Sequence, residues 1–318
     1  MRPSRQPAHT RTLTVRLTPG AERRLTADAR LIDVRKRGVV RVGSRLNGPG
    51  VIHDLRIELV LSPGAERIVD ARLSMASVPF AASARAEGEG CRDNERRASA
   101  LIGLPLGNGF LSGLQRVMGG VRGCFHVFTL MRMVATTTAR ACRQGLRHDV
   151  FSRALTVDAS WSADGLVLDG SLTDLAAELR ASDERPVAQF EAAAHLAASP
   201  HDLRITRAEA AYRSAGDLDV GGWTATGLDA LLGQSLARGY AMKLPDVVPS
   251  RGAEAPLHDV LRMMQPVAFQ AMPAMPGVDP TAAPRPHRPA VARDSCIMWR
   301  QDGPLVRAIE EEARGGVD

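Results

Sequence analysis

The N-terminal quarter of the chain alternates hydrophobic and polar positions in a way that predicts β-strands. The alternation runs with a period of two through residues 11–17, 27–34, 51–61 and 67–76. Such a pattern is typical of strands that have one buried and one solvated face. Ser62-Pro63-Gly64 separates the last two segments and is a turn signal, so we predict that they form a hairpin.

Beyond residue 90 the hydrophobic pattern changes to the period of helices. Residues 94–103, 107–118 and 124–146 have this spacing, and the last segment contains no proline. The predicted strands come first and the predicted helices follow, instead of alternating with them. This order predicts an α+β fold built on an antiparallel sheet.

The second half of the chain repeats the order of segments in the first half. Arg153-Ala-Leu-Thr-Val157 is similar to Arg11-Thr-Leu-Thr-Val15, and Leu231-Leu-Gly233 is similar to Leu101-Ile-Gly103. The offset shrinks from 142 residues (153 against 11) to 130 residues (231 against 101), as small deletions would produce. We therefore expect two tandem copies of one α+β unit, packed as a pseudo-dimer.

The expected boundaries are residues 1–148 for the first copy, 149–272 for a degenerate second copy without cysteine, and 273–318 for the remainder. Residues 273–292 are rich in proline, which predicts an extended linker. Asp294–Arg300 is a predicted strand and Leu305–Arg314 a predicted helix. This tail is expected to return Cys296 to the first copy.

The composition is that of a folded protein long enough to bury a sizeable core. The 318 residues are 44% hydrophobic and 24% charged. The sequence has no run of about 18 apolar residues, and Met1–Thr10 has no apolar stretch, so we expect neither a membrane span nor a secretory signal. Four cysteines are too few for a disulfide scaffold of this size. We therefore expect free thiols in the cytoplasm.

The formal net charge of +6 raises the question of a nucleic-acid partner. All but two of the 41 basic residues are arginine, and they are scattered among acidic residues, which is typical of a GC-rich coding bias. Aromatic residues make up only 4% of the chain and offer few stacking platforms. We expect no nucleic-acid and no membrane partner, whereas a small-molecule ligand and a homo-oligomer both fit the sequence.

The most specific local feature is the stretch Gly119-Gly-Val-Arg-Gly-Cys-Phe-His126. It presents Cys124 and His126 at the start of the predicted long helix, where the helix dipole lowers the pKa of a thiol and favours the thiolate. Thiolates bind metal ions and attack carbon. The alternative is a buried cysteine that acts as a small hydrophobe beside a capping histidine.

Two further cysteines extend this feature to a predicted metal site. Cys91 lies in a polar stretch that predicts a loop, and Cys296 follows the proline-rich segment. Together with Cys124 and His126 they would suit zinc or an iron–sulfur cluster. Cys142, several turns along the same helix, is assigned to the core.

His53 and Asp54 open the most regular predicted strand and are candidates for a general base and its partner. Adjacent residues of a strand point to opposite faces, however, so a solvated strand start is the alternative. The sequence has no phosphate-binding loop, no Gly-x-Ser-x-Gly, no His-Glu-x-x-His and no kinase signature.

Several of these segments together resemble the bacterial family named domain of unknown function 2889. They are Val51-Ile-His-Asp-Leu-Arg-Ile57, Ile68-Val-Asp-Ala-Arg72, Pro79, Cys91, Leu101-Ile-Gly-Leu104, Gly123-Cys-Phe-His126 and Asp294-Ser-Cys296. The resemblance covers the first copy and the tail. It implies that His53, Asp54, Cys91, Cys124, His126 and Cys296 act as a set, and it implies no particular reaction.

A second likeness concerns the order hairpin, cysteine, Leu-Ile-Gly and a Cys/His pair at a helix start. This order is similar to the NifU-type iron–sulfur scaffold proteins, which implies cluster assembly on three cysteines. Together these features predict a metal- or thiolate-dependent protein, with an enzyme acting on a small molecule as the leading hypothesis. A non-catalytic metal or iron–sulfur carrier, and a structural or partner-binding duplicate with inert cysteines, are the alternatives. An enzyme should bury its ligands beside an open coordination position, whereas a carrier should expose them.

Overall fold

The structure, a computed structural model, describes residues 5–42, 45–145, 149–178, 187–214, 222–277 and 294–315. The chain divides into two compact units, which we describe separately. Unit 1 comprises Met1–Thr14, Asp33–Gly38 and Asp149–Val278, and unit 2 comprises Val15–Ile32, Val39–His148 and Asp279–Asp318.

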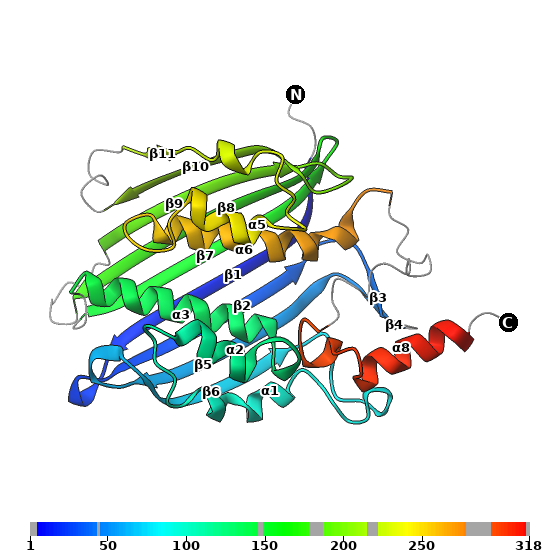
Figure 1. Ribbon diagram of the computed structural model, residues 1–318, viewed down its shortest axis with the longest axis horizontal. Helices are drawn as coiled ribbons and strands as arrows, with labels where there is room; N and C mark the ends of the chain where they lie inside the picture. The colour runs from blue at the N-terminus through cyan, green and yellow to red at the C-terminus, as the bar shows by residue number, and fades with distance from the viewer. Residues whose placement is uncertain are drawn as a thin grey trace. The chain divides into compact units, whose positions relative to one another are not determined.

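Long antiparallel strands make up much of both units (Figure 1). In chain order they are β1 (Gln6–Pro19), β2 (Leu25–Arg35), β5 (Gly50–Leu61), β6 (Ile68–Ser77), β7 (Asp149–Ser162), β8 (Gly165–Glu178), β9 (Val187–Ala198), β10 (Ile205–Ser214) and β11 (Thr224–Thr226). The strand order is β11-β10-β9-β8-β7-β1-β2-β5-β6, and β1 and β2 contribute residues to both units. A separate short pair consists of β3 (Val40–Val42) and β4 (Arg45–Asn47).

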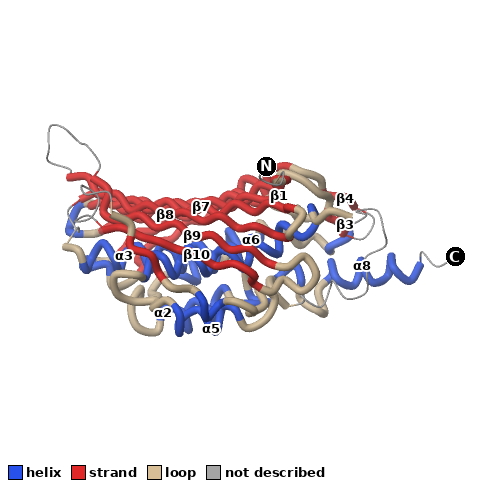
Figure 2. The backbone as a smooth tube through the Cα atoms, turned by 90° about the horizontal axis from the view of Figure 1, so that it is seen from above, coloured by secondary structure: helices blue, strands red, loops and turns tan. Residues whose placement is uncertain are grey.

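In each unit the helices lie on one face of the strands (Figure 2). They are α1 (Asp93–Arg96), α2 (Phe110–Met118), α3 (Phe125–Arg143) and α8 (Pro304–Gly315) in unit 2, and α5 (Tyr240–Val247) and α6 (Ala255–Ala271) in unit 1. The core lies between helices and strands, because both present alternate apolar residues to it. In unit 1, for example, Leu155 of β7 and Leu168 of β8 are as fully buried as Leu257 and Leu261 of α6.

The predicted α+β fold is confirmed, and the strands predicted in the first quarter correspond to β1, β2, β5 and β6. The helix predicted over residues 94–103 is wrong, because α1 is followed by a separate 3-10 turn, η4 (Ala98–Leu101). The strand predicted over residues 294–300 is also wrong. Asp294 has a φ of 59° and its N–H donates to the carbonyl of Trp299, which closes a turn around the 3-10 segment η8 (Ile297–Trp299). The helix predicted in the tail corresponds to α8.

Two series of elements follow the same order along the chain. The first series is β1, β2, β5, β6, α2 and α3, and the second is β7, β8, β9, β10, α5 and α6. Their hairpins share a local detail, since the register shifts next to Ile68 in β6 and next to Ile205 in β10. The N–H of Gly103 donates to the carbonyl of Ile68, and that of Gly233 to the carbonyl of Ile205, both at 2.8 Å.

This correspondence defines equivalent positions in the two series. His53 and Phe190 each lie 15 residues before the matching isoleucine (68 against 53, 205 against 190), and the helices align on the first residues of α3 and α6. The equivalent pairs used below are His9 and Phe151, Arg11 and Arg153, Asp33 and Asp174, His53 and Phe190, Cys124 and Glu254, and His126 and Pro256.

Candidate metal centre

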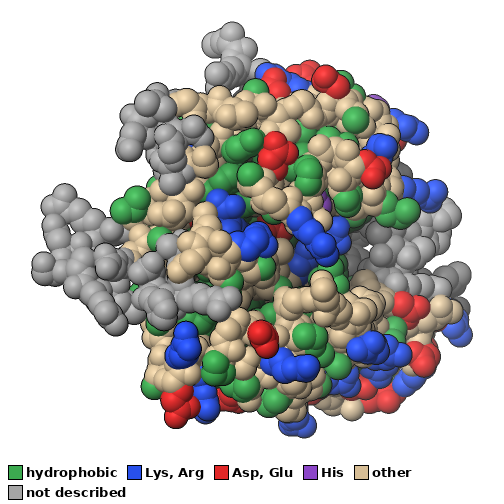
Figure 3. Space-filling model, turned by 60° about the vertical axis from the view of Figure 1, so that its left-hand side comes forward, with side chains coloured by type: hydrophobic (Ala, Val, Ile, Leu, Met, Phe, Trp, Pro, Cys, Tyr) green, Lys and Arg blue, Asp and Glu red, His purple; other side chains and the backbone are tan. Residues whose placement is uncertain are grey.

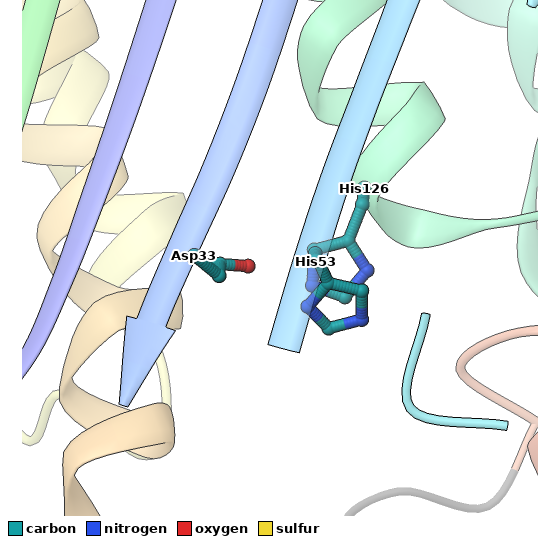
Figure 4. Close-up of side chains that lie close together, drawn as sticks. All are labelled: Asp33, His53 and His126. Atoms are coloured by element: carbon teal, nitrogen blue, oxygen red, sulfur yellow. The ribbon is translucent and has the colours of Figure 1, made fainter. Parts of the chain in front are cut away.

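Two histidines of unit 2 lie face to face where β5 passes the start of α3. His53 points from β5 to the covered face and is 6% exposed, while His126 lies in the first turn of α3 and is half-buried. Their ring centroids are 3.6 Å apart with the planes tilted by 31° (Figure 4). One ring nitrogen of each lies within 4.8 Å of one of the other. The two nitrogens are close enough to bind one ion after the rings turn, because the lone pairs of stacked imidazoles lie in the ring planes and do not converge as they stand.

Cys124 is the third member of this group. It is the N-cap residue of α3, and its Sγ lies 3.8 Å from Nδ1 of His126. Two ligands of one tetrahedral zinc ion, at about 2.3 Å for sulfur and about 2.05 Å for nitrogen, would be about 3.6 Å apart. The observed separation therefore suits either a shared ion or a hydrogen bond that orients the ring.

The loop before Cys124 depends on glycine. A Cβ on Gly123 would lie 2.6 Å from the carbonyl oxygen of Met118, the last residue of α2. Gly120 has a φ of 54°, a conformation that favours glycine. These two positions let the chain turn sharply between α2 and α3 and so place Cys124 and His126.

The two remaining predicted thiol ligands lie in a small apolar cluster of unit 2. Cys91 is only 8% exposed, although the sequence predicted a polar loop, and Cys296 packs against the same cluster together with Ile297 and Met298. Burial raises the pKa of Cys91, with smaller contributions from Cys124 and Cys296, and burial also raises the pKa of Cys296. Both groups are therefore neutral thiols at pH 7.

The predicted four-residue set is thus gathered in one part of unit 2 without closing around a point. Among the described residues, no three of Cys91, Cys124, His126 and Cys296 have their ligand atoms within 4.8 Å of one another. Cys124 contacts His126, and the further histidine that the structure places against His126 is His53.

The tail packs on the loop that carries Cys124. The N–H of Ile297 donates to the carbonyl of Gly123 at 2.8 Å, and Trp299 meets Phe80 edge to face at 5.7 Å. Arg300 pairs with Glu89 at 2.6 Å. Residues far apart in the sequence therefore hold the start of α3 in place.

Asp54 is not the partner of His53. Arg30 binds both carboxylate oxygens of Asp54 at 2.8 and 2.7 Å, and this hydrogen bonding lowers the pKa of Asp54. His53 points to the covered face and Asp54 to the other, as expected for neighbours on a strand. The arrangement offers His53 no carboxylate from its sequence neighbour.

A buried charged group of unit 1 was not found from the sequence. Arg11 of β1 donates from Nε and Nη2 to the two carboxylate oxygens of Asp33, both at 2.7 Å. His9 Nε2 lies 3.0 Å from Oδ1 of Asp33, the third side chain labelled in Figure 4. The available signal was the position of Arg11, which shares its strand face with Leu13 and Val15.

Acidic partners accompany many of the arginines in both units. In unit 2 Arg56 binds Asp28 at 2.8 Å, and in unit 1 Arg213 binds Glu191 at 2.5 Å. Basic and acidic side chains both appear on the surface shown in Figure 3. Nucleic-acid binding proteins use a continuous stripe of positive charge, and the expectation of no such partner stays a prediction.

Comparisons with known proteins match one segment of the chain, residues 9–140, to a protein family. No curated protein and no solved structure matches the chain. The likeness to NifU-type scaffolds stays a prediction, and no helix in the described part of the chain is long and apolar enough to cross a membrane. The matched segment contains His53, Cys91, Cys124 and His126 but ends before Cys296. Residues 9–140 match the model of the family described as Protein of unknown function (DUF2889), which confirms the resemblance for the first copy and leaves that of the tail a prediction.

Proposed function

We propose that the protein binds a transition-metal ion of the zinc class through His53 and His126, with Cys124 as a sulfur ligand or as the group that orients His126. The observation that carries the proposal is the closeness of donor atoms: a ring nitrogen of His53 and one of His126 lie within 4.8 Å of each other, and the Sγ of Cys124 lies 3.8 Å from Nδ1 of His126. Imidazole nitrogen and cysteine sulfur are common ligands of zinc.

The donor types narrow the class of ion. Imidazole nitrogen and thiolate sulfur suit zinc and other borderline metals, whereas magnesium and calcium prefer oxygen ligands. The neutral thiols Cys91 and Cys296 lie near Cys124 and can supply further sulfur once a cation lowers their pKa. The cytoplasmic setting inferred from the free cysteines supports the same chemistry.

An enzyme that acts on a small molecule is the role that the surroundings favour. His126 is half-buried and its neighbour Phe125 is 43% exposed, so a ligand can reach the ion from solvent. The tail bonds to the loop carrying Cys124, which suits retention of the ion better than its transfer. A non-catalytic carrier is the alternative, and rapid loss of the ion to a chelator would favour it.

We also infer that residues 149–272 descend from a tandem duplication and have lost the site. Gly109 and Gly239, which precede α2 and α5, share left-handed φ values of 81° and 79°. Phe190 and Pro256 occupy the positions equivalent to the two stacked histidines. The second copy would then act as a scaffold.

The test is the metal content and absorption spectrum of the untagged protein purified without chelators, compared with His53→Phe and Cys124→Ser. His53→Phe introduces the residue found at the equivalent position of β9, so the fold should accept it. His195→Phe is the matched control, because His195 lies on β9 and pairs with Asp169 at 2.7 Å. We expect about one ion per chain in the wild type and the control, and little in His53→Phe.

The spectrum identifies the ion, since visible absorbance indicates iron–sulfur and a colourless bound ion indicates zinc. Absence of metal in the wild type, both after anaerobic purification and after titration with Zn²⁺, contradicts the proposal. Equal metal content in all variants also contradicts it.

A further inference from the structure

Cys296 of the tail and Cys124 at the start of α3 are neighbours in space, although they lie far apart in the sequence. Both belong to unit 2, and both have an extended backbone, with φ values of −159° and −124°. Ile297, the residue after Cys296, donates its backbone N–H at 2.8 Å to the carbonyl of Gly123, the residue before Cys124. The two cysteines therefore flank one backbone hydrogen bond.

This hydrogen bond limits the distance between the two Cα atoms. In planar trans peptides, the accepting oxygen lies about 3.5 Å from the Cα that precedes the donor N–H and about 2.8 Å from the Cα that follows the carbonyl. The Cα atoms of Cys124 and Cys296 are therefore at most about 6.3 Å apart. Disulfides join Cα atoms that are about 4.4 to 6.8 Å apart. The backbone thus holds the two residues at a separation that a disulfide spans.

The side chains of the two cysteines share one environment. Cys296 packs against the apolar cluster of unit 2 that contains Cys91. Cys124 and Cys296 both contribute to the raised pKa of Cys91, so both sulfur atoms lie near that thiol. Cys91 itself is on another backbone segment, where its N–H donates to the carbonyl of Phe80 at 2.9 Å. The backbone contact therefore favours Cys124 and Cys296 as the pair, and Cys91 as a neighbour.

We propose that Cys124 and Cys296 are a redox modification site, at which a reversible disulfide attaches the tail covalently to the loop before α3. Hydrogen peroxide serves as the oxidant, and it can reach Cys296 from solvent because this residue is only partly buried. The two S–H bonds and the O–O bond break and one S–S bond forms. The two protons and two electrons of the thiols convert the peroxide to two water molecules. A dithiol reductant reverses the modification by thiol–disulfide exchange.

The disulfide also acts on the metal centre, and this part of the inference rests on the proposed function. As a thiol, Cys124 has its Sγ 3.8 Å from Nδ1 of His126. A sulfur atom in a disulfide cannot become a thiolate, the form that binds metal ions. Oxidation therefore weakens metal binding, and a bound ion protects Cys124 from oxidation.

Peptide mapping of the metal-free protein tests the pairing. Arginines separate the four cysteines, so trypsin releases each of them on its own peptide. The protein is treated with hydrogen peroxide, its remaining thiols are blocked with iodoacetamide, and it is digested without reductant. We expect a peptide pair that links Cys124 to Cys296 and that dithiothreitol separates. A non-reducing gel should show a single chain, which excludes a link between two molecules.

Two variants control the mapping. Cys142→Ser changes a partly exposed cysteine on α3 and should form the same linked pair. Cys296→Ser should form none. A disulfide that closes a long loop stabilises the folded state, so the oxidised wild type should melt at a higher temperature than the reduced wild type. Peroxide should give no such rise in Cys296→Ser. The Zn²⁺ affinity of the oxidised wild type should be at least about tenfold lower, and dithiothreitol should restore it.

The outcomes separate this inference from the proposed function. If peroxide gives no linked peptide, or if the link joins Cys91 to either of the other two cysteines, the redox site is overturned whether or not the protein binds metal. If the wild type forms the disulfide but binds no Zn²⁺ when reduced, the proposed function fails and the redox site stands. Equal Zn²⁺ affinity of the oxidised and reduced forms would overturn the control of the metal centre.

Discussion

The two series of elements share a scaffold and differ in their chemistry. Each buries an arginine that binds an aspartate of the next strand, as Arg11 binds Asp33 and Arg153 binds Asp174. Each also closes its hairpin on the same backbone hydrogen bonds between a glycine and an isoleucine. The histidines and the thiol of the first series are replaced in the second. The replacements are Phe151 for His9, Phe190 for His53, Glu254 for Cys124 and Pro256 for His126.

This difference separates what the fold needs from what the site needs. The buried ion pair is present in both series and therefore belongs to the fold. The imidazoles are present in one series, although phenyl rings fill the equivalent positions of β7 and β9 in the other. The second series adds its own structural contacts instead, such as the stacking of Phe190 on Tyr212 at 5.6 Å. The comparison thus indicates that the fold does not require histidine at these two strand positions.

Breaking the shared ion pair should have the largest effect. Arg153→Met leaves Asp174 and Asp259, both bound by Arg153 in unit 1, without their cation. Removing one partner of a buried pair costs about 3–5 kcal/mol in the free energy of unfolding. Urea denaturation of metal-free protein measures this loss. Arg204→Met, at an exposed arginine paired with Asp202, should cost less than about 0.5 kcal/mol, and an equal loss in both variants would contradict the argument.

The sequence predicted more of the fold than of the candidate site. Alternation of apolar residues located β1, β2, β5 and β6, because half-buried strands require it. The apolar run Cys296-Ile-Met-Trp299 predicted a strand. In the structure the N–H of Asp294 donates to the carbonyl of Trp299, and Ile297–Trp299 forms a 3-10 segment. The local pattern of apolar residues does not show which backbone hydrogen bonds a C-terminal segment will make.

The sequence identified the candidate site residues, but it did not predict which of them contact one another. His53 and His126 were both candidates, and they meet only because β5 passes the start of α3. The sequence instead suggested Asp54 as the partner of His53, which the strand geometry disfavoured from the outset. His9 escaped notice because a histidine and an arginine on an apolar strand face resemble an irregular start rather than a buried charged group.

The loop that places Cys124 should tolerate no larger residue at Gly123. Gly123→Ala puts a Cβ 2.6 Å from the backbone of Met118, so the loop or α2 must shift. Such overpacking costs about 1–3 kcal/mol, and the shift should also weaken Zn²⁺ binding. Gly107→Ala is the control, because nothing lies within 4 Å of its added Cβ. Wild-type Zn²⁺ affinity in Gly123→Ala would show that the loop does not set the geometry of the centre.

Weakening the contacts of the tail should have the smallest effect. It would show how far the tail contributes to the site of the first series. Arg300→Gln removes the partly buried pair with Glu89. The expected cost is below about 1 kcal/mol, because such pairs are partly screened by solvent. Trp299, which packs on Phe80 beside this pair, should become more accessible to acrylamide quenching. Arg314→Gln, whose partner Glu310 is 3.7 Å away at the exposed end of α8, should leave the quenching unchanged. If Arg300→Gln changes neither the quenching nor the rate at which a chelator removes the ion, the ion pair does not hold the tail, and the apolar packing of Ile297 and Met298 must do so alone.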